Sequence, residues 1–88
     1  MAWQVEWEDE AAKELKKLDT RAKRAIVRFM RDKIATEEDP RRFGEALRKD
    51  LKGLWKYRIG SYRVICSIED KQIVVLAVRV GHRRNVYR

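Results

Sequence analysis

The chain has 88 residues, 44% of them hydrophobic and 41% charged, and 22 Lys and Arg against 14 Asp and Glu give a net charge of +8. This length predicts one domain, residues 1–88, with one modest core, and the apolar fraction excludes a disordered chain. The single cysteine, Cys66, excludes a disulfide framework and a cysteine-based zinc site, and no apolar run approaches the roughly 20 residues that cross a bilayer. We therefore expect a cytoplasmic protein with no membrane partner.

The positive charge is concentrated near the carboxyl end. Residues 1–50 hold 13 Lys and Arg against 12 Asp and Glu, whereas residues 51–88 hold 9 against 2. A patch of this kind attracts nucleic acid or an acidic protein. We interpret the basic residues of the first half as solvated helix surface, with much of their charge offset by acidic neighbours.

A short strand is expected first in the chain. Residues 2–8 alternate Trp3, Val5 and Trp7 with polar residues, which gives one apolar face, and we expect this strand beside the last strand of the sheet. From residue 9 the apolar residues recur at spacings of four and three, which is the period of a helix.

This periodicity alone permits one long helix or two. We favour a helical hairpin with an N-cap at Asp9 and a break at Asp19, which would cap the second helix, because one helix of about 25 residues would be long for so small a core. Residues 36–40 end the helices before Pro40, since the residue before a proline is pushed out of the α region. Residues 41–53 are then expected to be a polar connector.

The last third predicts a three-stranded antiparallel meander. The expected strands are residues 54–59, 62–69 and 72–80. Two-residue turns at 60–61 and 70–71 join them. With the early strand added, the fold class is α+β: an N-terminal strand, a helical hairpin and a meander that completes a four-stranded sheet.

The first turn begins with Gly60, which suits type II′ geometry, and it fixes the register. Arg58 then faces Arg63, and Lys56 lies on the same side of the sheet. Like charges in direct opposition destabilise a sheet by a few tenths to about 1 kcal/mol, so we infer an anionic ligand, and phosphate suits arginine best. The alternative is three ordinary surface cations. The other face collects the apolar side chains Trp55, Tyr57, Ile59, Tyr62 and Val64.

The second turn makes further predictions. It places Arg79 opposite Tyr62 and puts Cys66 on the apolar face as a buried thiol. It also places four side chains on the cationic face, so that part of this face must be covered: Val74, Leu76, Val78 and Val80.

The order of elements and two local motifs resemble the RelE side of the RelE/ParE toxin superfamily, over essentially the whole chain. The motifs are the Tyr62-Arg63 pair after the turn, preceded by the lead-in at 51–58, and the ending Gly81-His82-Arg83-Arg84 to Tyr87. The resemblance implies a toxin of a type II toxin–antitoxin system that cleaves mRNA in the ribosomal A site and is neutralised by a cognate antitoxin. Its partners would be that antitoxin, the ribosome and mRNA, with DNA reached only through the antitoxin complex.

The resemblance also implies roles for individual residues. Arg63 corresponds to the phosphate-binding arginine of the family, Arg83 to its C-terminal catalytic arginine and Tyr87 to its late catalytic tyrosine. Lys56 and Arg58 correspond to a basic pair on the preceding strand, although a lysine is typical where Arg58 stands. The neighbouring side chains expected to assist in RNA binding are His82 and Arg84.

These residue types fit RNA cleavage by the attack of a 2′-hydroxyl on the adjacent phosphate. Arginines can stabilise the extra negative charge of the phosphorane but are poor bases. Clustered cations would lower the pKa of Tyr87 from about 10, which makes it a candidate base, and Lys56 is its rival; His82 is a candidate general acid. The meander region holds only two carboxylates, adjacent at a turn, so we expect a metal-independent endoribonuclease with no cofactor.

Other readings remain open. The fold would also suit a ParE-like inhibitor of DNA gyrase, an inactive chain, or a non-enzymatic domain that binds RNA or an antitoxin. The alignment of Arg63, Arg83 and Tyr87 favours the nuclease.

Overall fold

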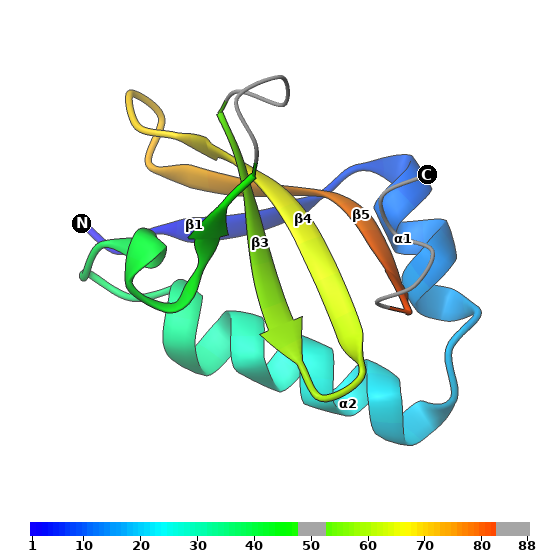
Figure 1. Cartoon of the computed structure of the whole chain (residues 1–88). Coiled ribbons are helices and arrows are strands. Elements are labelled where there is room, and N and C mark those ends of the chain that lie inside the picture. Colours follow the sequence, from blue (N-terminus) through cyan, green and yellow to red (C-terminus); the bar gives the residue numbers. More distant parts are fainter. Residues whose placement is uncertain (48–52, 83–88) are drawn as a thin grey trace.

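The computed structural model describes residues 1–47 and 53–82. In this part of the chain two helices lie against one face of a five-stranded sheet with the order β1-β5-β4-β3-β2 (Figure 1). The strands are β1 (Gln4–Trp7), β2 (Glu45–Ala46), β3 (Leu54–Ile59), β4 (Tyr62–Glu69) and β5 (Val74–His82). The helices are α1 (Asp9–Lys16) and α2 (Thr20–Phe29), followed by a π-helical turn, η1 (Met30–Ile34), and a 3₁₀ turn, η2 (Pro40–Phe43).

The expected helical hairpin is confirmed, with its break at Asp19. The Asp19 carboxylate accepts a hydrogen bond from the backbone N–H of Ala22 at 2.8 Å, so it caps α2 as predicted. The prediction that Asp9 caps α1 is wrong by one residue. Glu8 occupies the cap without a side-chain bond, and Asp9 is the first helical residue, where its charge suits the helix dipole.

The early strand lies where it was expected. β1 runs parallel to β5, with Gln4 beside Val74 and Trp7 beside Ala77. Trp3, Val5 and Trp7 pack against the core, as their alternation predicted.

The prediction of four strands is wrong, because the connector contains a fifth. β2 pairs antiparallel with β3, and Glu45 lies beside Lys56. A two-residue strand shows no alternation that a sequence could reveal. Gly44 allows the close approach, since a Cβ at that position would lie 3.0 Å from Cε1 of Tyr57.

The register of the first hairpin is confirmed, including Arg58 opposite Arg63. Gly60 has φ of 60°, and Ile73 is the one non-glycine residue with positive φ in the described segments, so Ser61 has negative φ. This combination fits the predicted type II′ turn.

The register predicted for the second hairpin is wrong. The turn spans residues 70–73 and not 70–71, Ile73 donates its N–H to the Asp70 carbonyl at 3.2 Å, and the ladder shifts again between Ile65 and Cys66. Tyr62 therefore faces His82 and not Arg79.

The shift also moves Val80 to the other side of the sheet. Val80 pairs with Val64 and is buried with it on the core side, so its prediction for the cationic face is wrong. Val74 and Leu76 pair with Glu69 and Ser67, which keeps both on the side of Arg63.

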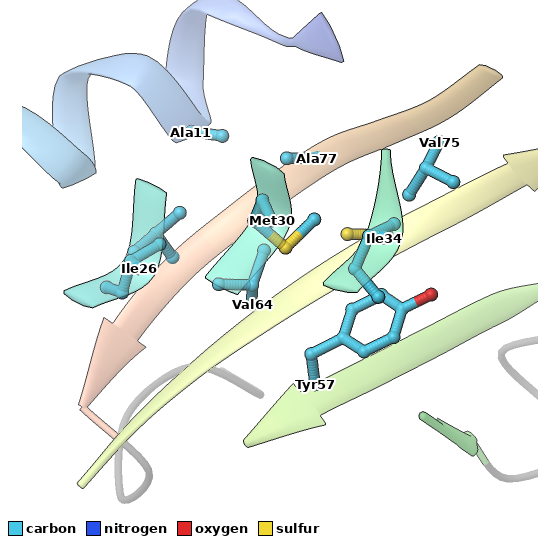
Figure 2. Packing of buried hydrophobic residues seen from close by; sticks show 10 residues of the cluster. Ala11, Ile26, Met30, Ile34, Tyr57, Val64, Val75 and Ala77 are labelled. Atoms are coloured by element: carbon cyan, nitrogen blue, oxygen red, sulfur yellow. The ribbon is translucent and has the colours of Figure 1, made fainter. Parts of the chain in front are cut away.

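The core lies between the helices and one face of the sheet (Figure 2). The helices and η1 contribute Ala11, Ile26, Met30 and Ile34, and the strands contribute Tyr57, Val64, Cys66, Val75, Ala77 and Val80. Burial raises the pKa of the Cys66 thiol, which fits the prediction of an inert buried cysteine. Among the described residues, no helix is long and apolar enough to cross a membrane.

Tyr57 ties the sheet to the connector. Its buried hydroxyl donates a hydrogen bond to the Pro40 carbonyl at 2.7 Å, and burial raises the pKa of this phenol. Because the core occupies the helix side of the sheet, the charged side chains of β3 and β4 are left on the opposite side.

Candidate functional site

The face of the sheet turned away from the helices carries a cluster of cations, which we call the cationic face. It is formed by Lys56 and Arg58 on β3 and Arg63 on β4, with Glu45 on β2 beside them. All four project to the side opposite Tyr57 and Val64, whose side chains are buried in the core. The structure therefore brings together the three cations that the first turn predicted to share a face.

Arg63 has hydrogen-bond donors without acceptors. Its Nε and Nη1 are buried and have no hydrogen-bond partner in the described part of the chain. Arg58 faces it on one side, and Gly81, which has no side chain, faces it on the other. A buried donor without a partner costs about 1–3 kcal/mol. This arrangement disfavours the free protein and suits an anion.

Glu45 is the acidic member of the cluster. Its Oε1 lies 3.1 Å from Nζ of Lys56, whose side chain is 20% exposed. The hydrogen bond and charge of Lys56, with smaller contributions from Arg58 and Arg63, hold the pKa of Glu45 below its usual range. The two arginines thus act on the same carboxylate as Lys56, and the four groups form one electrostatic unit.

His82 lies apart from these cations. It pairs with Tyr62, and the two rings meet edge to face with centroids 5.8 Å apart. Because residues opposite each other in an antiparallel pair share a face, His82 belongs to the face of Tyr62 and not to that of Arg63. The remaining expected site residues, Arg83, Arg84 and Tyr87, lie outside the described residues.

Glu14 on α1 has a role that the sequence did not reveal. Its carboxylate accepts a hydrogen bond from the backbone N–H of Val80 at 2.8 Å and lies 3.1 Å from both Nε and Nη2 of Arg79. Arg79 was expected opposite Tyr62, but it pairs with Glu14, which is 65 residues away and which no local pattern identifies. The contact holds the end of β5, the strand that carries Gly81 past Arg63.

The described residues contain no group of three or more His, Cys, Asp or Glu side chains that could hold a metal ion. The cluster of Lys56, Arg58, Arg63 and Glu45 therefore offers guanidinium, ammonium and carboxylate groups. They can bind and neutralise phosphate oxygens.

Comparisons with known proteins agree with this fold. A family model described as ParE toxin of type II toxin–antitoxin system, parDE, matches residues 5–87. Toxin RelG of Mycobacterium tuberculosis is 35% identical over 88 residues, which span 100% of this chain and 99% of that protein. Toxin RelE of the same organism is 35% identical over 78 residues, which span 89% of this chain and 78% of that protein.

Solved structures of toxin–antitoxin complexes match this fold as well. The crystal structure of the RelBE2 toxin–antitoxin complex from Mycobacterium tuberculosis matches with a TM-score of 0.85 and 32% identity, covering 97% of this chain and 95% of that chain. The archaeal RelE–RelB complex from Pyrococcus horikoshii matches with a TM-score of 0.72 and 25% identity, covering 98% and 100%. This chain belongs to the ParE toxin family of type II toxin–antitoxin systems, within the RelE/ParE superfamily.

Proposed function

We propose that this protein is a ribosome-dependent endoribonuclease, which cleaves mRNA in the A site and is neutralised by a cognate antitoxin. The observation that carries the proposal is the cationic face, where Lys56, Arg58 and Arg63 lie on one side of the sheet and two buried donors of Arg63 lack acceptors among the described residues. Phosphate oxygens are the acceptors that a guanidinium fork suits best.

In this mechanism the 2′-oxygen of one nucleotide attacks the adjacent phosphorus, and the bond from phosphorus to the 5′-oxygen of the next nucleotide breaks. The products are a 2′,3′-cyclic phosphate and a free 5′-hydroxyl. Arg63 would donate Nε–H and Nη1–H to the non-bridging oxygens as their charge grows. Donors that are already oriented and shielded from water are often the largest contribution to catalysis.

One proton must leave the 2′-hydroxyl and another must reach the 5′-oxygen. Lys56, whose Nζ lies 3.1 Å from Oε1 of Glu45, is suited to electrostatic support or proton donation. Since His82 shares the opposite face with Tyr62, it is the weaker candidate for that proton. The base that the family resemblance implies is Tyr87, with Arg83 as a second source of positive charge.

These residues offer few groups that transfer protons efficiently near neutral pH. We therefore propose that the ribosome contributes to catalysis by orienting the mRNA. A ribosome that holds the 2′-hydroxyl in line with the phosphate could supply about 7–11 kcal/mol through alignment alone. We therefore expect slow cleavage of free mRNA and fast cleavage of mRNA in the A site.

The solved relatives from Mycobacterium tuberculosis and Pyrococcus horikoshii are complexes with antitoxins. By analogy we propose a cognate antitoxin for this chain. An acidic segment that covers Arg58 and Arg63 would satisfy the unpaired donors and would exclude RNA.

A second candidate function is ParE-like inhibition of DNA gyrase, which the description of the matching family model favours. It requires no RNA chemistry. Mapping the cellular defect after induction separates the two, because a nuclease produces cuts within translated codons and a gyrase inhibitor changes DNA supercoiling first.

The test is controlled expression in a bacterial host of the wild type and of Arg63→Ala, Arg83→Ala and Tyr87→Phe, with growth and transcript 5′ ends as the readouts. Lys71→Ala is the matched control, because Lys71 is an exposed cation in the turn between β4 and β5. We expect growth arrest with cuts inside codons for the wild type and the control, and neither effect for the two arginine variants. Arrest that persists unchanged in all three site variants would contradict the proposal.

A further inference from the structure

The last residues of β5 are held from the side of α1 by one carboxylate. Glu14 accepts a hydrogen bond from the backbone N–H of Val80, one residue before Gly81, which pairs with Arg63. We propose that Glu14 is a positioning residue for RNA cleavage, because its bond to Val80 sets where the end of β5 lies beside Arg63. The inference rests on the proposed nuclease function and adds to it a residue from the helix side of the sheet.

The outer edge of β5 loses its strand partner before β5 ends. β1 stops at Trp7, which lies beside Ala77, and the N–H of Glu8 donates to the Ala77 carbonyl at 2.9 Å. Within residues 1–47 and 53–82, no strand pairs with this edge beyond Ala77. A strand paired on one side opens more easily than a strand paired on both. The end of β5 therefore needs another contact to keep a fixed position.

Pairing with β4 does not fix this end by itself. The ladder between β4 and β5 shifts between Ile65 and Cys66, so the pairs on the far side of the shift are not set by the turn alone. The pair of Gly81 with Arg63 is one of them. The register beside Arg63 is thus open to control by a contact from outside the ladder.

Glu14 supplies that contact with both of its carboxylate oxygens. Oε1 accepts the N–H of Val80 at 2.8 Å, and Oε2 lies 3.1 Å from both Nε and Nη2 of Arg79. The side chain of Glu14 is 21% exposed, so most of it is shielded from water. Two consecutive residues of β5 are therefore held by one carboxylate.

Both sides of the contact are anchored in the core. Ala11 of α1 and Ala77 of β5 are both fully buried (Figure 2), and the Val80 side chain is buried as well. Residues three apart share a face of a helix, so the face of α1 that carries Ala11 also carries Glu14. The carboxylate therefore reaches the strand from a helix that is fixed in place.

The contact matters for cleavage because the candidate site begins one residue further along the strand. Gly81 pairs with Arg63, and Arg83, which the proposed mechanism uses as a second source of positive charge, follows two residues later in the sequence. A displacement of about 1 Å in a catalytic geometry can lower a rate about 100-fold. A partly exposed ion pair contributes little to stability, and the Arg79 side chain is 38% exposed. Loss of Glu14 should therefore affect the rate of cleavage far more than stability.

The test compares three substitutions of Glu14 with one control. Glu14→Met keeps the length but has no acceptor, Glu14→Asp keeps the charge but is one methylene shorter, and Glu14→Gln keeps an oxygen that can accept the N–H of Val80. The matched control is Glu10→Met, because Glu10 is an exposed acid on the same helix.

Three quantities are measured on each variant. They are kcat and KM for cleavage of mRNA in the A site of programmed 70S ribosomes, the thermal unfolding of the free toxin, and hydrogen exchange at the Val80 amide. The exchange rate reports the contact directly and does not depend on RNA.

We expect kcat to be at least about 10-fold lower for Glu14→Met and Glu14→Asp than for Glu10→Met, with KM within about two-fold, because Glu14 lies on the helix side of the sheet. Glu14→Gln should keep kcat within about three-fold of the wild type, since a neutral oxygen still accepts the N–H. Exchange at Val80 should be faster in Glu14→Met and Glu14→Asp than in Glu14→Gln.

Wild-type values of kcat in both Glu14→Met and Glu14→Asp would overturn the inference and leave the proposed function standing. A rise in KM with kcat preserved would assign Glu14 to RNA binding, and a loss in Glu14→Gln as large as in Glu14→Met would assign the effect to the charge that faces Arg79; either overturns the inference. If Glu14→Met does not fold, Glu14→Asp decides. If the wild type cleaves no mRNA on ribosomes, the proposed function fails first, and the inference fails with it.

Discussion

Replacing Arg63 should stabilise the free protein, because the surroundings of its guanidinium in the described part of the chain are unfavourable. Its Nε and Nη1 are buried without acceptors in the described part of the chain, and Arg58 lies directly opposite. Arg63→Met keeps a side chain of similar length while removing both the charge and the unsatisfied donors. The substitution should therefore abolish RNA cleavage and raise stability together.

The expected magnitude follows from these contacts. An unsatisfied buried donor costs about 1–3 kcal/mol, and a directly opposed like charge costs about 0.2–1 kcal/mol. The substitution removes both costs but also loses the packing contacts of the guanidinium, which offsets part of the gain. We therefore expect a net rise of about 1–3 kcal/mol in the free energy of unfolding. For a domain of this size, each kcal/mol corresponds to a rise in Tm of roughly 4–8 °C.

The assay is urea unfolding of the free toxin, without antitoxin or RNA, at low salt. Arg58→Met is the matched control, because Arg58 is exposed and its removal relieves only the opposed charge. We expect a rise below about 1 kcal/mol for the control. An Arg63→Met protein that is less stable than the wild type would refute the reasoning, since it would mean that the guanidinium contributes net stability where it lies.

Three further predictions concern the core and the acidic member of the site. Tyr57→Phe leaves the buried Pro40 carbonyl without its donor and should lower the free energy of unfolding by about 1–2 kcal/mol. The hydroxyl of Tyr62 has no partner in the described segments, so the control Tyr62→Phe should lower it by less than about 0.5 kcal/mol. Thermal unfolding of the two variants measures the difference. Burial raises the folded-state pKa of both Cys66 and Tyr57, so the unfolded chain loses these protons at lower pH than the folded protein does. The free energy of unfolding should therefore fall as pH rises above about 8.5, through Cys66, and again above about 10, through Tyr57. Urea unfolding at several pH values tests this, and Cys66→Ala should remove the first decline. Glu45→Gln removes the negative charge beside Lys56 and should strengthen the binding of single-stranded RNA a few-fold at low salt. The gain in affinity should disappear near 1 M salt, where the charges are screened. Unchanged affinity at low salt would contradict the role assigned to the cluster.

Local sequence rules predicted the elements whose cause is local. The cap at Asp19 and the turn at Gly60 are each determined by a few adjacent residues, and both were confirmed. Because a two-residue turn fixes the pairing of everything beyond it, the opposition of Arg58 and Arg63 follows from the amino-acid sequence alone. The central part of the candidate site was therefore predictable from the sequence.

The errors have a different origin. The second turn extends to Ile73, a β-branched residue at φ of 57°, which residue preferences disfavour. The ladder shift next to Cys66 has no sequence signature, yet together with the longer turn it places His82 beside Tyr62. The short strand at Glu45 exists only because β3 presents an edge to it. Each feature depends on a partner that is distant in sequence, so local patterns did not reveal it.

The end of β5 shows how such a distant contact can control the site. β1 stops at Trp7, beside Ala77, so the outer edge of β5 has no strand partner beyond that point in the described chain. The Glu14 carboxylate takes the place of the strand, because it accepts the N–H of Val80. One residue later Gly81 pairs with Arg63 and has no side chain of its own. Through this contact α1, on the other side of the sheet, helps to position the end of β5, the strand that pairs with Arg63.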